Sequence, residues 1–552
     1  MTVSEPQSFE RHQNEAPSQG IPPVVGRQKL CGRAFYESIG SPKKILAPMV
    51  DQSEFAWRLL TRSFMPSDSD SRESLLAYTP MLHARLFGQT SSYRDNHFQA
   101  TRMTLPSPPD PYHQSQFPNS DIYLDGNPAI DRPLFVQFCA NSPDELLSAA
   151  QYVQPFCDAV DLNLGCPQGI AKKGRYGAFL QEDWGLIYKL INRLHNELMV
   201  PITAKIRVLE TKEQTLEYAN MVLSAGASIL TVHGRTREQK GHNTGLADWS
   251  KIRYLRENLP PETVIFANGN ILRGEDIDHC LEATGADGVM SAEGNLCDPT
   301  IFATPPAQEE EGREYWRGRD GKGGFRMDAV MRRYMDILYK FVLEIPPPIR
   351  RPLFLPSDVV ETHTEAFNQI DGGDQDQRPS KKMRFDERPA KCSSPNLLAM
   401  KAHLFSLLRP LVSKHTNIRD ALAKCRAGDL AAYEDVLTMV ENATKEGLLK
   451  YEAQSGEPPP PPAGDGRTFE ESPDIPTPAL VARPWWVCQP YVRPLPKEAY
   501  QKGSMTLSKK EKARLQREYE NRATGGREVV DPVPLSGASN GGLVNDREAH
   551  RH

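Results

Sequence analysis

The sequence predicts an α/β protein, a (β/α)₈ TIM barrel followed by a small all-α helical domain. Short apolar runs rich in β-branched residues recur between about residues 44 and 302, and amphipathic stretches separate them. Such runs are typical of parallel strands buried on both faces, and the stretches between them of crossover helices. Eight β–α units over roughly 260 residues match a closed barrel. A doubly wound sheet is the alternative, but it rarely needs eight strands with polar residues ending nearly every one.

The eight predicted strands follow one another along the chain. They are ILAPMV (45–50), LLAYTP (75–80), LFVQF (134–138), DAVDLNL (158–164), ITAKIRV (202–208), SILTVH (228–233), TVIFAN (263–268) and DGVMSA (287–292). Gly226 and Gly285 fall at helix-to-strand turns, where glycines commonly end helices. We therefore assign the barrel to residues 41–310. It carries a small polar insertion at 66–74 and a proline-rich one at about 101–131.

The segments outside the barrel differ in their periodicity. Residues 1–40 lack any period and are expected to be disordered. Helical periodicity over 325–450 predicts the helical domain, with Asp429 as the N-cap of one helix. A Pro-, Asp- and Gln-rich tract at 346–394 is expected to interrupt this domain as a disordered insertion. Residues 451–552 are expected to form an extended, partly basic tail.

Composition narrows the class of protein. A chain of 552 residues with 47 prolines suggests several modules and non-globular stretches. None of the nine cysteines forms a C-x-x-C pair, so no metal site is predicted. Scattered cysteines, an acidic start and no long apolar run predict a protein of the cytoplasm, the nucleus or both, neither secreted nor in a membrane. The net charge of −5 means that nucleic-acid binding would need a local basic face.

Polar or glycine-bearing residues end nearly every predicted strand, where the functional groups of such barrels collect. Any one of them could be an ordinary strand cap, but the set together is harder to explain in that way. In chain order the set comprises Pro48, Met49, Gln137, Asn163, Cys166, Lys205, Arg207, His233, Arg235, Asn268, Gly269, Asn270 and Ser291 to Gly294.

Lys205 lies inside an otherwise apolar strand, which predicts an anionic ligand beside it. The last two strands end in 268-NGN and 292-AEGN, glycine-bearing turns at the position where these barrels hold phosphate. No G-x-G-x-x-G follows a strand, so a resident nicotinamide is not expected. A phosphate seat together with a lysine facing a flavin ring favours FMN as the cofactor, with Lys205 stabilising negative charge on the reduced ring.

Cys166 stands in a Gly-Cys-Pro turn just past the fourth strand. A free cysteine is often a small buried hydrophobe, and that interpretation suits Cys139 and Cys157. Cys166 instead lies at the carboxyl ends of the strands, which we call the barrel mouth, and a functional role is favoured there. Free thiols are mostly protonated at neutral pH, so Cys166 can serve as a general acid.

Several of these strings resemble the motifs of the tRNA-dihydrouridine synthases, and most of all the eukaryotic subgroup that acts on D-loop positions 16 and 17. The resemblance runs almost continuously over 44–302. It rests on APMVDQSEFAWR (47–58), VQFCANSP (136–143), DLNLGCPQGIAKKGRYGAFLQ (161–181), TAKIRV (203–208), TVHGRTREQKG (231–241), FANGNI (266–271) and GVMSAEGNL (288–296). The helices beyond 325 and the string WWVCQPYVRPLPK (485–497) also resemble parts of that subgroup.

The resemblance implies a role for each matching position. Cys166 falls on the catalytic cysteine of the family. FMN contacts are implied for Pro48, Met49, Val50, Gln137, Lys205, His233, Asn268, Gly269, Asn270, Ala292, Glu293 and Gly294. Asn163, Arg207 and Arg235 are expected to contact the uracil edge or the flavin.

The implied reaction has two halves. NADPH or NADH first reduces FMN, and a uridine flipped out of the tRNA then receives hydride at C6 and a proton from Cys166 at C5. The chain is expected to act as a monomer and to bind tRNA through the helical domain and a basic stretch at 502–527. Two alternatives stay open: an FMN barrel that reduces or oxidises free pyrimidines, and a catalytically silent RNA-binding protein.

Overall fold

A computed structural model of the chain describes residues 29–66, 74–109, 122–358, 392–454 and 483–493. The expectations for residues 1–28, for 359–391 within the interrupting tract, and for 455–482 and 494–552 of the tail lie outside the described residues. The basic stretch at 502–527 is among them. Residues 451–453, expected to begin the extended tail, instead continue a helix that starts at Leu430.

The barrel is closed, and every predicted strand is present. Its strands are β1 (Lys44–Leu46), β2 (Leu75–Tyr78), β4 (Leu134–Cys139), β5 (Ala159–Leu164), β6 (Ile202–Arg207), β7 (Ile229–His233), β8 (Val264–Asn268) and β9 (Gly288–Ser291). Each pairs in parallel with its neighbours, and β2 closes the ring by pairing with both β1 and β4. A doubly wound sheet would have two open edges, so the closure excludes that alternative. A two-residue strand, β3 (Leu82–His83), extends the carboxyl end of β4.

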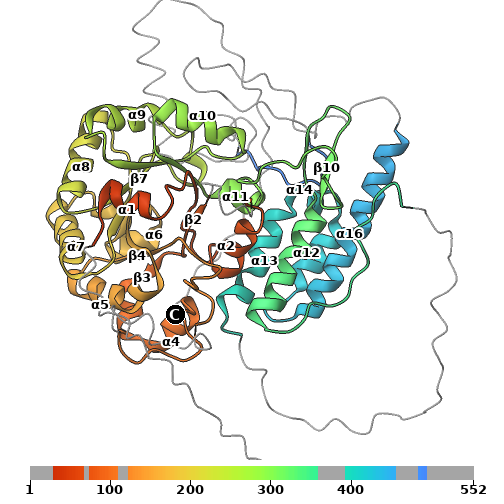
Figure 1. Cartoon of the computed structure of the whole chain (residues 1–552), viewed down its shortest axis with the longest axis horizontal. Helices are drawn as coiled ribbons and strands as arrows, with labels where there is room; N and C mark the ends of the chain where they lie inside the picture. The colour runs from red at the N-terminus through yellow and green to blue at the C-terminus, as the bar shows by residue number, and fades with distance from the viewer. Residues whose placement is uncertain (1–28, 67–73, 110–121, 359–391, 455–482, 494–552) are drawn as a thin grey trace, which may run out of the picture. The chain divides into compact units, whose positions relative to one another are not determined.

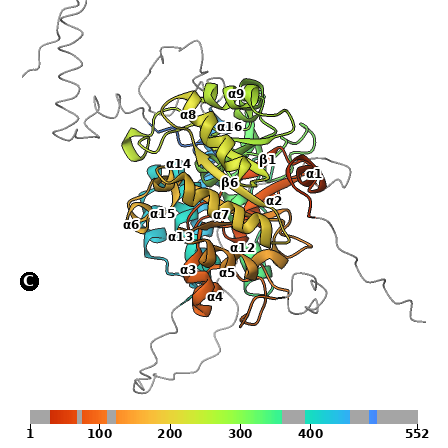
Figure 2. The same ribbon diagram turned by 90° about the vertical axis from the view of Figure 1, so that its left-hand side faces the viewer.

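Helices surround the strands, as Figures 1 and 2 show. They are α2 (Phe55–Arg62), α3 (Ala84–Gln89), α4 (Ser91–His97), α5 (Pro143–Val153), α6 (Gly169–Gly174), α7 (Trp184–Glu197), α8 (Lys212–Ser224), α9 (Trp249–Asn258), α10 (Glu275–Thr284) and α11 (Glu293–Cys297), with 3₁₀ turns η2 (Gln154–Phe156), η3 (Gly177–Leu180) and η4 (Gly241–Asn243). The side chains of Ser142, Asp183, Thr211 and Asp248 cap α5, α7, α8 and α9. These caps satisfy backbone donors that the first helical turn leaves free, so local sequence fixes where each helix begins.

A helix that the sequence analysis missed closes the amino-terminal end of the barrel. Helix α1 (Gly32–Ser38) falls within the range predicted to be disordered, and that prediction is wrong for residues 29–40. Phe35 stacks on Phe135 with ring centroids 5.8 Å apart, and Tyr36 packs against Phe266. Both aromatic side chains are buried, which supplies the free energy that orders this short helix.

The helical domain follows the barrel and packs on α2 and α11 (Figure 1). It contains α12 (Met327–Ile337), a π-helical turn η5 (Leu338–Val342), α13 (Pro395–Leu407), α14 (Arg409–Lys414), α15 (Thr416–Lys424) and α16 (Leu430–Ala453). Asp429 caps α16 as predicted, because its side chain accepts a hydrogen bond from Ala432 N at 3.2 Å. A hairpin that the sequence did not predict, β10 (Tyr315–Arg317) and β11 (Gly323–Phe325), links the two domains.

Two segments expected to lack order are packed within their described residues. In 346–358, Arg350 donates to Asp336 and Glu434, and Leu353 is buried. In 483–493, Trp486, Val487 and Cys488 are buried, and Val487 bridges to Arg326. The ends of the predicted insertion and part of the predicted tail therefore belong to the packed helical domain.

Among the described residues, no helix combines the length and apolar character needed to cross a bilayer. Within the same residues, no cluster of three or more His, Cys, Asp or Glu side chains could hold a metal ion. All nine cysteines are free thiols.

Candidate active site

A buried hydrogen-bond network connects three neighbouring strands, β4, β5 and β6, to the turn that carries Cys166. Asp161 on β5 accepts from Gln137 Nε2 at 2.8 Å and from Thr203 Oγ1 at 2.7 Å. Gln137 Oε1 accepts from Asn163 Nδ2 at 2.7 Å. Asn163 Oδ1 in turn accepts from the backbone N of Cys166 at 2.9 Å. The network therefore sets the position of the Cys166 backbone from the barrel interior.

The carbonyl side of Cys166 is held as well. Its oxygen accepts from Ala178 N at 3.1 Å. Gly177 has a φ of +65°, and a Cβ there would lie 2.8 Å from that same oxygen. Only glycine suits this close approach. The Cys166 side chain remains partly exposed, so a fixed backbone presents a reachable thiol.

Tyr176 and Cys139 form the wall beside this thiol. Cys166 packs in one cluster with Cys139, Ala171 and Tyr176. Burial raises the pKa of Cys139 to about 12, and a hydrogen bond with Tyr176 opposes that shift. Burial also raises the pKa of Tyr176 to about 12. Cys139 is thus a neutral buried thiol, as expected, and it lies next to Cys166.

Lys205 is a cation without a carboxylate partner among the described residues. Its Nζ donates to Asn268 Oδ1 at 3.0 Å, and Asn268 Nδ2 donates to Met290 O at 2.9 Å. Burial and the nearby charge of Arg207 lower the pKa of Lys205 to about 8. The nearby Asp161 carboxylate opposes this lowering. The ammonium is therefore charged at neutral pH, and the anionic ligand expected beside it stays a prediction.

His233 and Arg235 bring the last turns of the barrel together. Arg235 Nη1 lies 3.1 Å from His233 Nε2, and Arg235 Nη2 donates to Asn270 Oδ1 at 2.7 Å. Burial, with the charges of Lys205, Arg207 and Arg235, lowers the pKa of His233 well below its ordinary value. His233 is consequently neutral, and its Nε2 accepts a hydrogen bond from Arg235 Nη1.

Arg207 braces two loops of the mouth. Its Nε donates to Gly165 O at 2.6 Å, next to Cys166, and its Nη1 donates to Thr236 O at 2.9 Å. We expected Asn163, Arg207 and Arg235 to contact substrate or flavin. In the structure most of their polar atoms are already bonded within the protein, which favours positioning as their main role.

The turns after β8 and β9 are too tight for side chains. Gly269 has a φ of +113°, and a Cβ there would lie 2.6 Å from Ala247 Cβ. A Cβ on Gly294 would lie 2.4 Å from Ile271 O. Ala292 is the N-cap of α11, and Glu293 is the first residue of this five-residue helix. The predicted phosphate seat is therefore a pair of closely packed backbone turns.

The loop after β1 contributes apolar surface. Met49 is partly buried against the cores on both sides of the barrel wall, and its backbone N donates to Ser53 Oγ at 3.0 Å. Pro48 is partly exposed, and Val50 is 55% exposed. An apolar loop, a buried cation and two glycine turns at one mouth suit a planar cofactor that carries a phosphate.

Sequence reasoning missed Asp161, Thr203 and Tyr176. Asp161 precedes Asn163 by two positions on one strand, so both face the barrel interior. That alternation was a signal available in the sequence. Burial raises the pKa of Asp161 to about 6, so the carboxylate is ionised at neutral pH and accepts on both oxygens.

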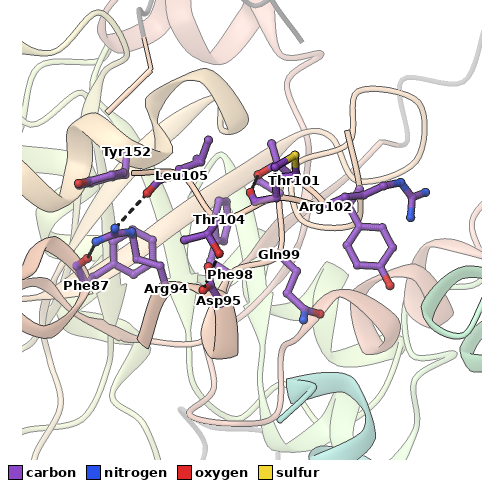
Figure 3. A pocket seen from close by; sticks show the side chains of 13 residues that line it. Phe87, Arg94, Asp95, Phe98, Gln99, Thr101, Arg102, Thr104, Leu105 and Tyr152 are labelled. Carbon is purple, nitrogen blue, oxygen red and sulfur yellow. Dashed lines mark hydrogen bonds between the residues drawn. The ribbon is translucent and has the colours of Figure 1, made fainter. Parts of the chain in front are cut away.

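Two cavities lie away from the mouth. One, of about 190 Å³, is lined by residues of α4 and the loop after it, including Arg94 and Thr104, and by Tyr152 of α5 (Figure 3). Arg94 donates to Phe87 O and Leu105 O and stacks over the Tyr152 ring. The other cavity, of about 530 Å³, lies between the barrel and the β10–β11 hairpin. Neither is lined by Cys166 or Lys205.

Known proteins are similar to this chain in sequence over most of its length. The family model described as "Dihydrouridine synthase (Dus)" matches residues 45–341. The tRNA-dihydrouridine(16/17) synthase (NAD(P)+) of Schizosaccharomyces pombe is 42% identical over 85% of this chain and 93% of its own. The protein of the same name from Saccharomyces cerevisiae is 41% identical over 85% and 88%. A Rattus norvegicus protein named as like these is 35% identical over 87% and 81%. With this match spanning the barrel, the cysteine turn and the first helix beyond the barrel, the chain belongs to the dihydrouridine synthase family.

Proposed function

We propose that this chain reduces uridines 16 and 17 of tRNA to dihydrouridine, using FMN and either NADPH or NADH. One observation carries the proposal. The Cys166 thiol and the Lys205 ammonium lie at one barrel mouth, because Asn163, which holds the Cys166 backbone, and Lys205 are paired residues on β5 and β6. Among the described residues, the ammonium donates to the Asn268 amide oxygen and forms no direct ion pair with a carboxylate. The relatives whose names state this activity support the positions, the nicotinamide and the tRNA substrate. FMN is supported by the family and by the donor set at the mouth.

The mouth holds the cofactor through charge and backbone shape. Lys205 offers its ammonium to the electron-rich edge of the flavin ring, and Met49 and Val50 supply apolar contact. Gln137 and Asn268 hold the side chains around this cation in place. Asn270, Gly269 and the Ala292–Gly294 turn form the phosphate end. When bound, FMN supplies the hydride that reaches uracil C6.

In the second half-reaction, the reduction of uridine, the protein itself supplies the proton. Cys166 Sγ–H donates to uracil C5 as the hydride arrives at C6, so both new C–H bonds form and the C5–C6 double bond is lost. Cys166 must stay protonated before this step and be reprotonated afterwards from solvent. Asn163 and Arg207 hold the backbone of the cysteine turn during the transfer. A positioned acid of this kind contributes about 10²–10⁴ in rate.

Substrate binding is proposed to use the helical domain and the tail. The domain's basic side chains are less available than the sequence suggested. Arg332 pairs with Glu441 and Arg333 with Glu314, while Lys401 donates to Ala423 O. Arg409 and Lys414 lie over the Tyr491 and Trp485 rings. The basic stretch at 502–527 is therefore expected to supply more of the phosphate contacts, in a monomer.

The test uses full-length protein and unmodified tRNA transcript. Purified protein should be yellow with a flavin spectrum, should bleach with NADPH or NADH, and should then yield dihydrouridine at positions 16 and 17. Free uridine and uracil, tested in parallel, should not be reduced. Reduction of the free pyrimidines alone would favour the alternative of an FMN barrel that acts on free pyrimidines. A colourless protein that FMN cannot reconstitute would leave only an RNA-binding role.

A further inference from the structure

Arg493, near the far end of the chain, reaches the predicted phosphate end of the barrel mouth. Its Nε lies 2.8 Å from Glu293 Oε1 and 3.0 Å from Glu293 Oε2. Glu293 is the first residue of α11, directly between Ala292 and Gly294. A side chain 200 positions away in the sequence is thereby brought to the turn after β9.

The segment that carries Arg493 is firmly attached. Met327 N donates to Trp486 O at 2.9 Å, and Cys488 N donates to Phe325 O at 2.9 Å. Trp486, Val487 and Cys488 are buried. Further along, the Arg409 guanidinium lies 4.1 Å from the Tyr491 ring centroid. The segment (blue in Figure 1) thus runs from the β10–β11 hairpin past α14 to the mouth.

The carboxylate at this place is unfavourable for a phosphate ligand. Glu293 would repel a dianionic phosphate held by its own turn. Arg493 forms the ion pair that the structure shows with Glu293. Burial lowers the pKa of Arg235 to about 10. The charge of Glu293 raises this pKa and the charge of Arg493 lowers it, so both residues act electrostatically on Arg235. The charges of Arg235, Arg493 and Glu293 sum to +1, and removing Arg493 would lower that sum to zero. Arg207 also acts on Arg235 and is the same in both cases.

We propose that Arg493 belongs to the phosphate seat of the flavin, where it cancels the charge of Glu293 and so allows the phosphate to bind. This inference rests on the proposed function, since it needs FMN as the cofactor. Arg493 acts here as a positioning residue. The segment at 483–493 then has two roles: it fastens the helical domain to the barrel, and it completes the cofactor site.

The experiment compares FMN with riboflavin, which has the same ring and ribityl chain but no phosphate. Full-length protein stripped of flavin is titrated with each, and quenching of flavin fluorescence gives the two dissociation constants. Arg493→Ala is expected to weaken FMN binding about tenfold and to leave riboflavin binding unchanged. A half-exposed charge–charge contact accounts for a change of that size.

Three further proteins sharpen the result. Arg493→Lys keeps the charge and should retain most of the FMN affinity. Arg493→Ala combined with Glu293→Gln should restore it, because the repelling carboxylate is gone. Arg419→Ala is the matched control, since Arg419 is 52% exposed like Arg493 and pairs with Asp420 on α15. Thermal unfolding of each protein shows whether the fold is kept.

The two proposals fail in different ways. If wild-type protein binds neither flavin, the proposed function is wrong. If wild-type protein binds FMN but Arg493→Ala binds it equally well, or loses FMN and riboflavin alike, the inference about Arg493 is wrong. A selective loss that Glu293→Gln does not reverse overturns the cancellation of charge.

Discussion

The barrel mouth and the surroundings of α2 both hold buried charges, but they compensate them differently. Around α2, the Arg58 guanidinium donates to Asp131 at 2.5 Å and to Asp125 at 2.7 Å. His403 Nε2 lies 3.0 Å from both oxygens of Glu54. At the mouth, the Lys205 ammonium donates only to an amide oxygen among the described residues.

This difference in charge compensation distinguishes a region that stabilises the fold from a region that is suited to bind a ligand. Around α2 the chain supplies both members of each polar pair, and the His403 ring also stacks on Trp57 with centroids 3.8 Å apart. The Arg58 pairs lie within the barrel domain, whereas the His403 contacts join it to the helical domain. Each set is complete without a ligand. At the mouth the Lys205 ammonium forms no direct ion pair among the described residues, and the nearby Asp161 carboxylate offsets only part of the cost of its burial. This lowers stability unless a ligand binds. We therefore expect the mouth to be completed by a ligand, whereas the α2 region is completed by the chain itself.

The largest expected effect separates chemistry from folding at the mouth. Cys166→Ala should slow dihydrouridine formation about 10²–10⁴-fold, because the proton donor is lost. Flavin reduction by NADPH should stay near the wild-type rate. Stopped-flow bleaching of the flavin and single-turnover dihydrouridine assays measure the two halves. Equal loss in both halves would mean that Cys166 holds the cofactor.

The control for this variant is Cys157→Ala. Cys157 is buried before β5, at the opposite end of the barrel. Cys139, which the sequence also predicted to be a small buried hydrophobe, is a poorer control because it packs in one cluster with Cys166. Cys157→Ala should leave both half-reactions unchanged.

The next largest effect concerns the α2 region. Asp131→Ala should lower the free energy of unfolding by about 3–5 kcal/mol, because Arg58 would keep only one of its two carboxylates in a buried site. Urea denaturation followed by circular dichroism measures it. Asp420→Ala, which removes an exposed pair, should change stability by no more than about 0.5 kcal/mol. Similar losses in both would show that burial does not strengthen the Arg58 contacts.

Lys205→Met should act in the opposite direction on the protein without flavin. Burial lowers the pKa of Lys205 to about 8, so at pH 7 the folded state carries a charge that it solvates poorly. Removing that charge should stabilise the flavin-free protein by about 1–2 kcal/mol while weakening FMN binding at least about tenfold. Thermal unfolding with and without FMN tests both parts. A loss of stability in the flavin-free protein would show that Lys205 is compensated by the protein alone.

The smallest effect is a pH dependence of FMN binding. Lys205 has a lowered pKa of about 8, so in the flavin-free protein its charge is present below pH 8 and lost as the pH rises through that value. FMN affinity should therefore fall about five- to tenfold between pH 7.5 and 9. The ratio of wild-type to Lys205→Met affinity isolates this group from titration of the flavin. A ratio that stays constant over the range would remove Lys205 from cofactor binding.

Strand periodicity is enough to predict that Cys166 and Lys205 lie at one mouth. Parallel strands have their carboxyl ends on the same side, so residues that follow β5 and β6 must lie close together. The partner of each side chain was less predictable. Asn163 was expected to meet substrate, but its amide joins Gln137 to the Cys166 backbone. That pairing depends on the register between neighbouring strands, and the sequence of one strand does not determine this register.

The sequence by itself determined the closed barrel, the helical domain and the cysteine turn, because each rests on a local pattern of apolar residues or glycines. Only the tertiary structure decided that α1 plugs the barrel and that residues 483–493 reach its mouth. These short segments have no period of their own. Their order comes from burial against residues far away in the chain, Phe35 on Phe135 and Cys488 on Phe325. Such contacts form only after the barrel and the helical domain have brought their partners together.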